Sequence, residues 1–139
     1  MQIQPYLFFE GRAEEAIEFY RKTLGAEVQM LMRYKDSPEQ QPKGERTPPG
    51  DKVMHSCLRI GDTEIMASDG FAQGKPNFQG FALSLNARDD AQARRWFEAL
   101  ADGGKVQQPL VKTFFSSSFG MVSDRFGLMW MVVVPQAKK

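Results

Sequence analysis

The sequence has 139 residues, of which 42% are hydrophobic and 25% are charged, as expected for one ordinary globular domain with a core of its own. Its 18 lysines and arginines nearly balance 17 acidic residues, so net charge favours neither nucleic acid nor a membrane surface as a partner. The single cysteine, Cys57, excludes an internal disulfide and a cysteine-rich zinc site. Neither a membrane span nor a signal peptide is evident, so we expect a cytoplasmic protein.

The first half of the chain predicts a strand, a helix and three further strands. The β-rich segment 3–9 contains Pro5, which suits a short or edge strand. From 12 to 24 apolar residues recur at spacings of three and four, which predicts an amphipathic helix that stops at Gly25. Three further strands are predicted at 26–34, 52–60 and 64–68.

A polar segment at 36–51 interrupts this order. It holds four prolines and two glycines, which indicates a surface loop. Two interpretations remain open for this loop, a solvated linker and a lid over a pocket.

The second half repeats the same pattern. A strand at 80–86 precedes a helix that opens at Asp89 and Asp90 and ends near residue 101. Strands at 105–111 and 119–124, with a serine-rich loop at 113–118 between them, come next. An Asp-x-Phe-Gly turn ending at Gly127 then leads into an uncharged strand at 128–134.

The two halves look like a duplication, since 13–20 and 90–97 place a small residue and an aromatic pair at equal spacing. The order therefore predicts an α+β fold of tandem β-α-β-β-β modules, with module 1 at about 1–70, a linker at about 71–78 and module 2 at about 79–135. Such modules should bury their free sheet faces in an open cupped barrel with a pocket. Edge strands that need covering favour a homodimer.

A resemblance to a known family rests on four motifs: Pro5-Tyr-Leu-x-Phe, AEEAIEFYRKTLGAE, MHSCLRIGDTEIMASDG and SDRFGLMWM. They resemble the PhnB-like branch (3-demethylubiquinone 3-methyltransferase-like domain) of the glyoxalase/bleomycin resistance/extradiol dioxygenase, or vicinal oxygen chelate, superfamily. The resemblance covers about residues 3–135 and implies this superfamily's fold. The chain contains no glycine-rich strand-loop-helix motif that would hold the nucleotide part of a methyl donor.

The resemblance also implies where a metal would bind. Metal-bearing members place ligands at four positions, which match Gln4 or Pro5, Gln79 or Gly80, Met131 and Met66 here. Glutamine ligates weakly and the other types offer nothing to a hard divalent cation. We therefore expect no tight inherited metal site and no cofactor. The alternative is a metal-dependent glyoxalase-, dioxygenase- or resistance-type enzyme whose rearranged site recruits His55 and either Gln4 or Glu10.

His55 is the only histidine and the candidate catalytic residue, because its pKa suits a general base near neutrality. A purely structural strand histidine is the competing interpretation. Strand alternation places it on one face with Val53 and Cys57, about 7 Å from the latter, too far for a tight catalytic pair.

The predicted ligand-binding residues are Gln4, Tyr6, Phe8, His55 and Trp130. The aromatic residues among them have a competing interpretation as filling of the core or of a dimer interface. The leading functional interpretation is a protein that binds a small molecule without a tight inherited metal site. Whether it is also an enzyme is left open.

Overall fold

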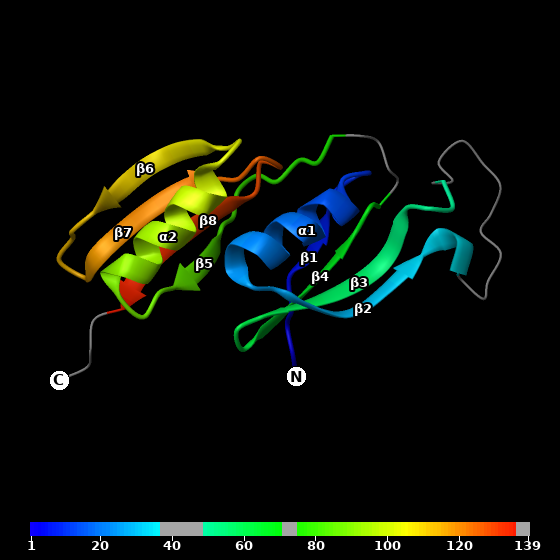
Figure 1. Cartoon of the computed structure of the whole chain (residues 1–139), viewed down its shortest axis with the longest axis horizontal. Helices are drawn as coiled ribbons and strands as arrows, with labels where there is room; N and C mark the ends of the chain where they lie inside the picture. Colours follow the sequence, from blue (N-terminus) through cyan, green and yellow to red (C-terminus); the bar gives the residue numbers. More distant parts are fainter. Residues whose placement is uncertain (37–48, 71–74, 136–139) are drawn as a thin grey trace. The chain divides into compact units, whose positions relative to one another are not determined.

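The computed structural model describes residues 1–36, 49–70 and 75–135, which form two compact units, Met1–Pro76 (unit 1) and Asn77–Lys139 (unit 2). Each unit contains one long helix and one four-stranded sheet (Figure 1). The unit boundary lies inside the predicted linker. Most of the predicted loop at 36–51 lies outside the described residues.

Unit 1 contains β1 (Tyr6–Phe8), α1 (Ala13–Leu24), β2 (Glu27–Arg33), the short 3-10 helix η1 (Tyr34–Asp36), β3 (Val53–Ile60) and β4 (Thr63–Ser68). The strands lie in the order β1-β4-β3-β2. β1 runs parallel to β4 and the other pairs are antiparallel. The three-residue β1 at the sheet edge confirms what Pro5 predicted.

One face of this sheet packs against α1. The helix buries the predicted apolar stripe, and Gly25 ends it in the left-handed conformation at φ 69°. Beneath the helix the sheet contributes Leu7, Leu58 and Ala67, each no more than 2% exposed. Because side chains alternate along a strand, their neighbours in sequence point to the opposite face.

Unit 2 contains β5 (Leu83–Asn86), α2 (Asp90–Ala101), β6 (Lys105–Val111), β7 (Ser116–Ser123) and β8 (Met129–Pro135). Its strand order, β5-β8-β7-β6, matches that of unit 1, with β5 parallel to β8. The α+β class and the tandem β-α-β-β-β order are therefore confirmed.

Two details of unit 2 differ from the prediction. Ser116–Ser118 belong to β7 rather than to a loop, since Ser116 pairs with Pro135 across a register shift. Ser116 is fully buried, and its Oγ accepts a hydrogen bond from Val134 N at 3.1 Å. At the register shift between β7 and β8, this hydroxyl thus takes the place of a backbone carbonyl as the acceptor for Val134. The apolar stripe of the second predicted helix also predicts that both Trp96 and Phe97 are core, but Phe97 is buried on α2 while Trp96 is partly exposed.

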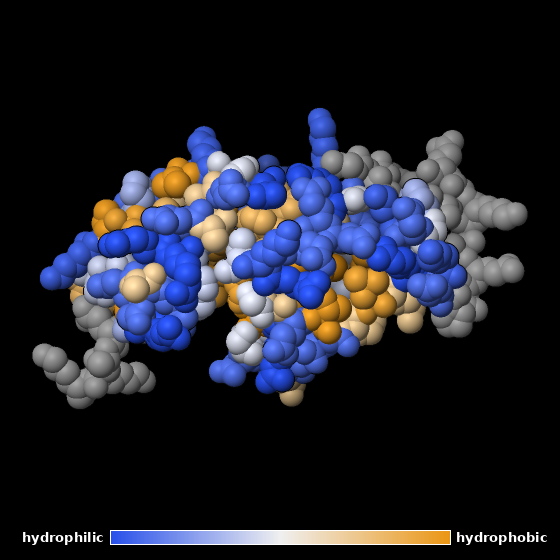
Figure 2. All heavy atoms as spheres, in the orientation of Figure 1, coloured by the Kyte–Doolittle hydropathy of each residue, from blue (hydrophilic) through white to orange (hydrophobic). Residues whose placement is uncertain are grey.

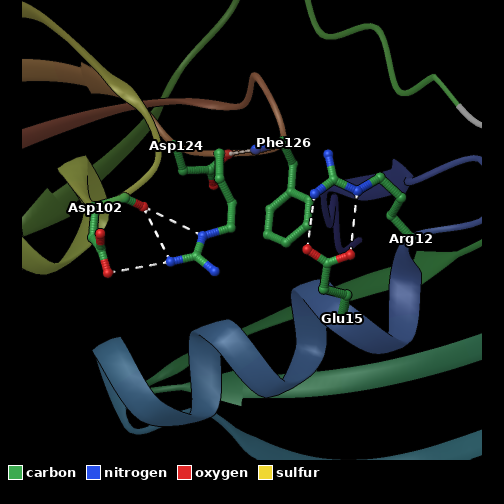
Figure 3. A network of polar contacts seen from close by, with 6 residues as sticks. Arg12, Glu15, Asp102, Asp124 and Phe126 are labelled. Carbon is green, nitrogen blue, oxygen red and sulfur yellow. Dashed lines mark hydrogen bonds and ion pairs between the residues drawn. The ribbon is translucent and has the colours of Figure 1, made fainter.

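The predicted closing turn is confirmed. Gly127 has a φ of 86°, and the Asp124 carboxylate accepts a hydrogen bond from the backbone N–H of Phe126 at 2.9 Å (Figure 3). The same carboxylate oxygen accepts a second one from the backbone N–H of Leu128 at 3.1 Å. The other carboxylate oxygen accepts from Trp130 Nε1 at 3.0 Å. Trp130 is only 3% exposed, so its ring packs in the core of unit 2.

The face drawn in Figure 2 is mainly hydrophilic, with apolar patches over β2 and over β6. Val28 and Met30 on β2 are 40% exposed, and Val106 and Val111 on β6 are 42% exposed. Within the described part of the chain, neither α1 nor α2 is long and apolar enough to cross a membrane.

Candidate functional site

The face of the unit 1 sheet opposite α1, here called the open face, carries most of the predicted site. Cys57 pairs with Met30 on one side and with Met66 on the other, and Met66 pairs with Tyr6. Paired residues on neighbouring strands present their side chains on the same face about 5 Å apart. A row of soft, apolar side chains therefore crosses all four strands.

A β-bulge shapes the end of this face near β1. Met32 pairs with His55 and Arg33 pairs with Val53, so Met54 is an extra residue on β3. Val53 is fully buried, whereas Met54 and His55 are half-exposed. The prediction that Val53 shares a face with His55 is therefore wrong, because the bulge breaks the alternation on which it rested.

Two rings pack against the ring of Tyr6. Its ring centroid lies 4.9 Å from that of Phe8 and 5.6 Å from that of His55, with interplanar angles of 31° and 29°. A hydrogen bond of 3.0 Å joins Tyr6 Oη and His55 Nδ1. The phenol thereby fixes the orientation of the imidazole, and the structure brings these three predicted residues together.

A groove of about 520 Å³ opens beside this cluster, lined by Tyr6, Phe8, Glu10, Tyr34, Met54, Ser68 and Gly70. Its walls are mainly aromatic and thioether side chains. Glu10 is the one charged residue among these lining residues, and it comes from the turn between β1 and α1.

The backbone at Glu10 is unusual. Its φ of 52° lies in the left-handed region, and among the described residues no other non-glycine residue has a positive φ. This conformation costs a side-chain-bearing residue roughly 1–2 kcal/mol. Its carboxylate lies over Gly70, where an added Cβ would come within 2.5 Å of Glu10 Oε2 and 3.3 Å of Phe8 Cδ1. Because Gly70 has no side chain, the Glu10 carboxylate and the Phe8 ring have room to lie against its backbone.

The buried Asp69 carboxylate stabilises the turn between β1 and α1 that carries Glu10. Its carboxylate is 1% exposed and accepts hydrogen bonds from Gly11 N at 3.0 Å, Ala13 N at 2.8 Å and Val53 N at 2.6 Å. It thus ties the end of β4 to the start of α1 and the start of β3. Arg12 pairs with Glu15 at 2.8 Å on the first turn of α1 (Figure 3).

Tyr34 closes another side of the groove. Its hydroxyl donates a hydrogen bond to the carbonyl of Gly70 at 2.8 Å. Burial raises the pKa of Tyr34 above its ordinary value, and the charges of Tyr6, in its ionised form, and of the Asp69 and Glu10 carboxylates raise it further. The phenol is therefore a neutral donor at physiological pH, in a region of negative potential.

The far end of the open face holds Gln4, Cys57 and Glu64. Glu64 Oε2 accepts hydrogen bonds from Gln4 Nε2 at 3.3 Å and from Cys57 Sγ at 3.8 Å. Burial and the Glu64 carboxylate raise the pKa of the Cys57 thiol. Cys57 and His55 thus have different partners, and the raised pKa disfavours the thiolate that a nucleophile requires.

Among the predicted ligand-binding residues, Tyr6, Phe8 and His55 lie together and Gln4 lies on the same sheet. Trp130 lies instead in the core of unit 2, as its competing interpretation expected. The groove residues that the prediction missed are Tyr34, Met54, Ser68 and Gly70. Only a pairing pattern reveals the bulge that turns Met54 outward, and sequence alone does not supply it.

The positions matched to family metal ligands hold no cluster of donors. Met66 and Met131 lie within strands, paired with Tyr6 and Ser84 respectively. Across residues 1–36, 49–70 and 75–135, no group of three or more His, Cys, Asp or Glu side chains is arranged to hold a metal ion.

Comparison with known proteins places the chain in a family. A family model described as 3-demethylubiquinone-9 3-methyltransferase matches residues 1–133. The chain belongs to this family. The resemblance inferred from the four motifs is thereby confirmed.

Several relatives match over nearly their whole length. Protein YjdN of Escherichia coli (strain K12) is 37% identical over 141 residues, 96% of this chain and 95% of YjdN. The crystal structure of PA1353 from Pseudomonas aeruginosa is 42% identical, with a TM-score of 0.84 and coverage of 99% of both chains. A Bacillus cereus structure described as a putative 3-demethylubiquinone-9 3-methyltransferase, PhnB protein, is 26% identical, with a TM-score of 0.80 and coverage of 96% of this chain and 99% of that one.

A more distant structure shows the fold class. The glyoxylase/bleomycin resistance protein/dioxygenase domain from Frankia sp. EAN1pec is 11% identical, with a TM-score of 0.67 and coverage of 97% of this chain and 95% of that one. The chain therefore has the glyoxalase/bleomycin resistance-like fold that its motifs implied.

Proposed function

We propose that this protein binds a small organic molecule in the groove on the open face of unit 1. The observation that carries the proposal is the groove itself, whose volume of about 520 Å³ falls within the roughly 300–1,000 Å³ typical of ligand sites. Membership of a family whose fold neighbours include glyoxylase and bleomycin resistance domains supports the same function.

The lining suits a ligand with an apolar body. Tyr6, Phe8 and Met54 offer ring faces and a thioether, which bury apolar surface without demanding hydrogen bonds. Phe8 is 52% exposed, so a ligand against it would remove apolar area from water at about 25 cal/mol per Å².

A few polar groups would orient the ligand. Tyr6 lines the groove, and its hydroxyl is held in one position by the hydrogen bond to His55 behind it. Ser68 Oγ accepts a hydrogen bond from Gly70 N at 3.2 Å, which leaves its own proton for another acceptor. This combination of apolar walls and few fixed polar groups is typical of selective sites.

A fragment screen followed by two-dimensional NMR on isotope-labelled protein tests the proposal. We expect at least one fragment to shift the amide signals of groove residues, and Phe8→Ala to weaken its binding by about ten-fold, or ~1.4 kcal/mol. Phe114→Ala is the matched control, because Phe114 lies in unit 2 at 92% exposure. Shifts that map away from the groove for every fragment, or no shifts at all, would overturn the proposal.

We also propose that the protein is a homodimer. Exposed apolar residues on β2 and β6 support self-association, because such patches commonly mark interaction surfaces. Light scattering coupled to size exclusion is expected to give twice the 15.7 kDa of one chain. A single-chain mass at high protein concentration would contradict this.

A further inference from the structure

We infer that the groove selects an organic cation, such as an ammonium attached to an apolar or aromatic body. This inference rests on the proposed function and specifies its ligand class. Three features of the groove support this ligand class: one carboxylate lies among ring faces, an unusual backbone conformation puts it there, and further negative charge lies nearby.

Glu10 supplies the anionic partner. Its carboxylate is positioned over Gly70 and next to Phe8, inside the groove lining. A carboxylate offers about four lone-pair directions, so it accepts a hydrogen bond from a ligand while also serving a protein neighbour. At a site partly shielded from water, a charge-assisted hydrogen bond of this kind is roughly twice as strong as a neutral one.

The rings supply the second attraction. Tyr6, Phe8 and Tyr34 all line the groove that holds Glu10. The faces of such rings carry partial negative charge and attract a cation within about 6 Å. A neutral ligand of the same size gains the apolar contact only, and an anionic ligand is repelled by both the carboxylate and the ring faces.

The charge around Tyr34 agrees with this choice. Burial raises the pKa of the Tyr34 hydroxyl most, and Asp69 and Glu10 raise it further, as expected where two carboxylates lie near that wall of the groove. Ligands that bring positive charge to this wall are therefore favoured over neutral ones.

The conformation at Glu10 is the independent observation. Asparagine or glycine adopts a φ of 52° more readily than glutamate does. A strained residue that persists at a groove indicates a functional side chain there. Gly70, with its own φ of 55°, leaves the space that the Glu10 carboxylate fills.

Three soluble probes of matched size separate the charge classes: benzylamine, benzyl alcohol and benzoate. Their dissociation constants are measured by NMR titration of the intact chain. We expect benzylamine to bind about ten-fold tighter than benzyl alcohol, and benzoate to bind more weakly than both. Equal affinities for the three would overturn the cation inference and leave the proposed function standing, whereas no groove shifts with any probe would overturn both.

Two substitutions at Glu10 test the residue assignment. Glu10→Gln is expected to remove most of the preference for benzylamine over benzyl alcohol, leaving the smaller part that the ring faces supply, and to leave the affinity for benzyl alcohol within about two-fold. Glu10→Asn is expected to lose the same selectivity while raising the urea midpoint, because asparagine tolerates the left-handed region. Glu18→Gln changes the net charge equally on the exposed side of α1, where Glu18 pairs with Arg21, and should leave all three affinities unchanged. A preference for benzylamine that stays at its full size in both Glu10 variants would overturn the inference.

Discussion

Removing the Asp69 carboxylate is expected to lower the free energy of unfolding of unit 1 more than any of the other substitutions proposed for that unit. The carboxylate is 1% exposed and accepts three backbone hydrogen bonds from two separate segments. In Asp69→Ala each of those three N–H groups loses its partner, at about 1–3 kcal/mol for a buried donor. Because the losses share one site and are not additive, we expect a total of about 3–5 kcal/mol, a large part of a typical stability of about 5–15 kcal/mol.

Asp69→Asn separates the contributions of the two carboxylate oxygens to this total. Oδ1 accepts from Gly11 and Ala13, whereas Oδ2 accepts from Val53 at 2.6 Å. An asparagine that keeps its oxygen on the first pair turns an NH₂ group toward the Val53 N–H, so only that bond is lost. We expect a cost of about 1–3 kcal/mol, below that of the alanine variant.

Urea unfolding followed by circular dichroism measures both costs. Asp89→Ala is the matched control, because Asp89 caps α2 through one hydrogen bond to Gln92 N at 2.8 Å. Loss of a single cap costs about 1 kcal/mol. If Asp69→Ala lowered the free energy of unfolding by no more than Asp89→Ala does, the role assigned to Asp69 would be refuted.

Four further outcomes are expected. Trp130→Phe should cost about 1–3 kcal/mol, measured by urea unfolding, because a buried carboxylate loses a donor. Cys57 should react slowly with iodoacetamide at pH 8, and Glu64→Gln should speed the reaction, because Glu64 helps to raise the pKa of the thiol. The hydrogen bond from Arg33 lowers the pKa of Glu14 below its ordinary value of 4.5. This pair therefore stabilises the fold above pH 4.5, and the contribution is lost as the pH falls through the lowered pKa of the folded state. Glu14→Gln should make the melting temperature at low salt less sensitive to acid. Elemental analysis of protein purified without chelator should find substoichiometric divalent metal, and one full equivalent would favour a rearranged metal site.

The features that the sequence predicted well depend on local chemistry. The helix at Ala13–Leu24 follows from a period of three and four and a glycine stop. The short edge strand follows from Pro5, which removes a ladder donor. The closing turn follows from Asp124 and Gly127, whose side-chain acceptor and positive φ act within four residues.

The features that were missed depend on partners far along the chain. The sequence left two interpretations of Trp130 open, a ligand-binding residue and a core residue. The structure places it in the core of unit 2, where its indole N–H bonds to Asp124. The bulge at Met54 depends on the register with β2. The groove unites residues from five segments, which are β1, the turn between β1 and α1, η1, β3 and the end of β4 with its turn. No single segment carries a recognisable motif for it.

The two modules begin their helices by different means, and this difference accounts for a groove turn in unit 1. In unit 2 the cap is local: Asp89 accepts from Gln92 N, and Gln92 Oε1 accepts from Arg88 N at 2.9 Å, a reciprocal arrangement that fixes the connection in ordinary backbone geometry. In unit 1 the N-cap residue Arg12 provides no side-chain cap, and Asp69 serves the start of α1 from the far end of β4. Because the cap comes from outside, the β1–α1 connection is free to adopt two successive positive φ values, and the first of them presents Glu10 to the groove. The hydrogen bonds of the buried Asp69 carboxylate thus support the strained backbone conformation at Glu10.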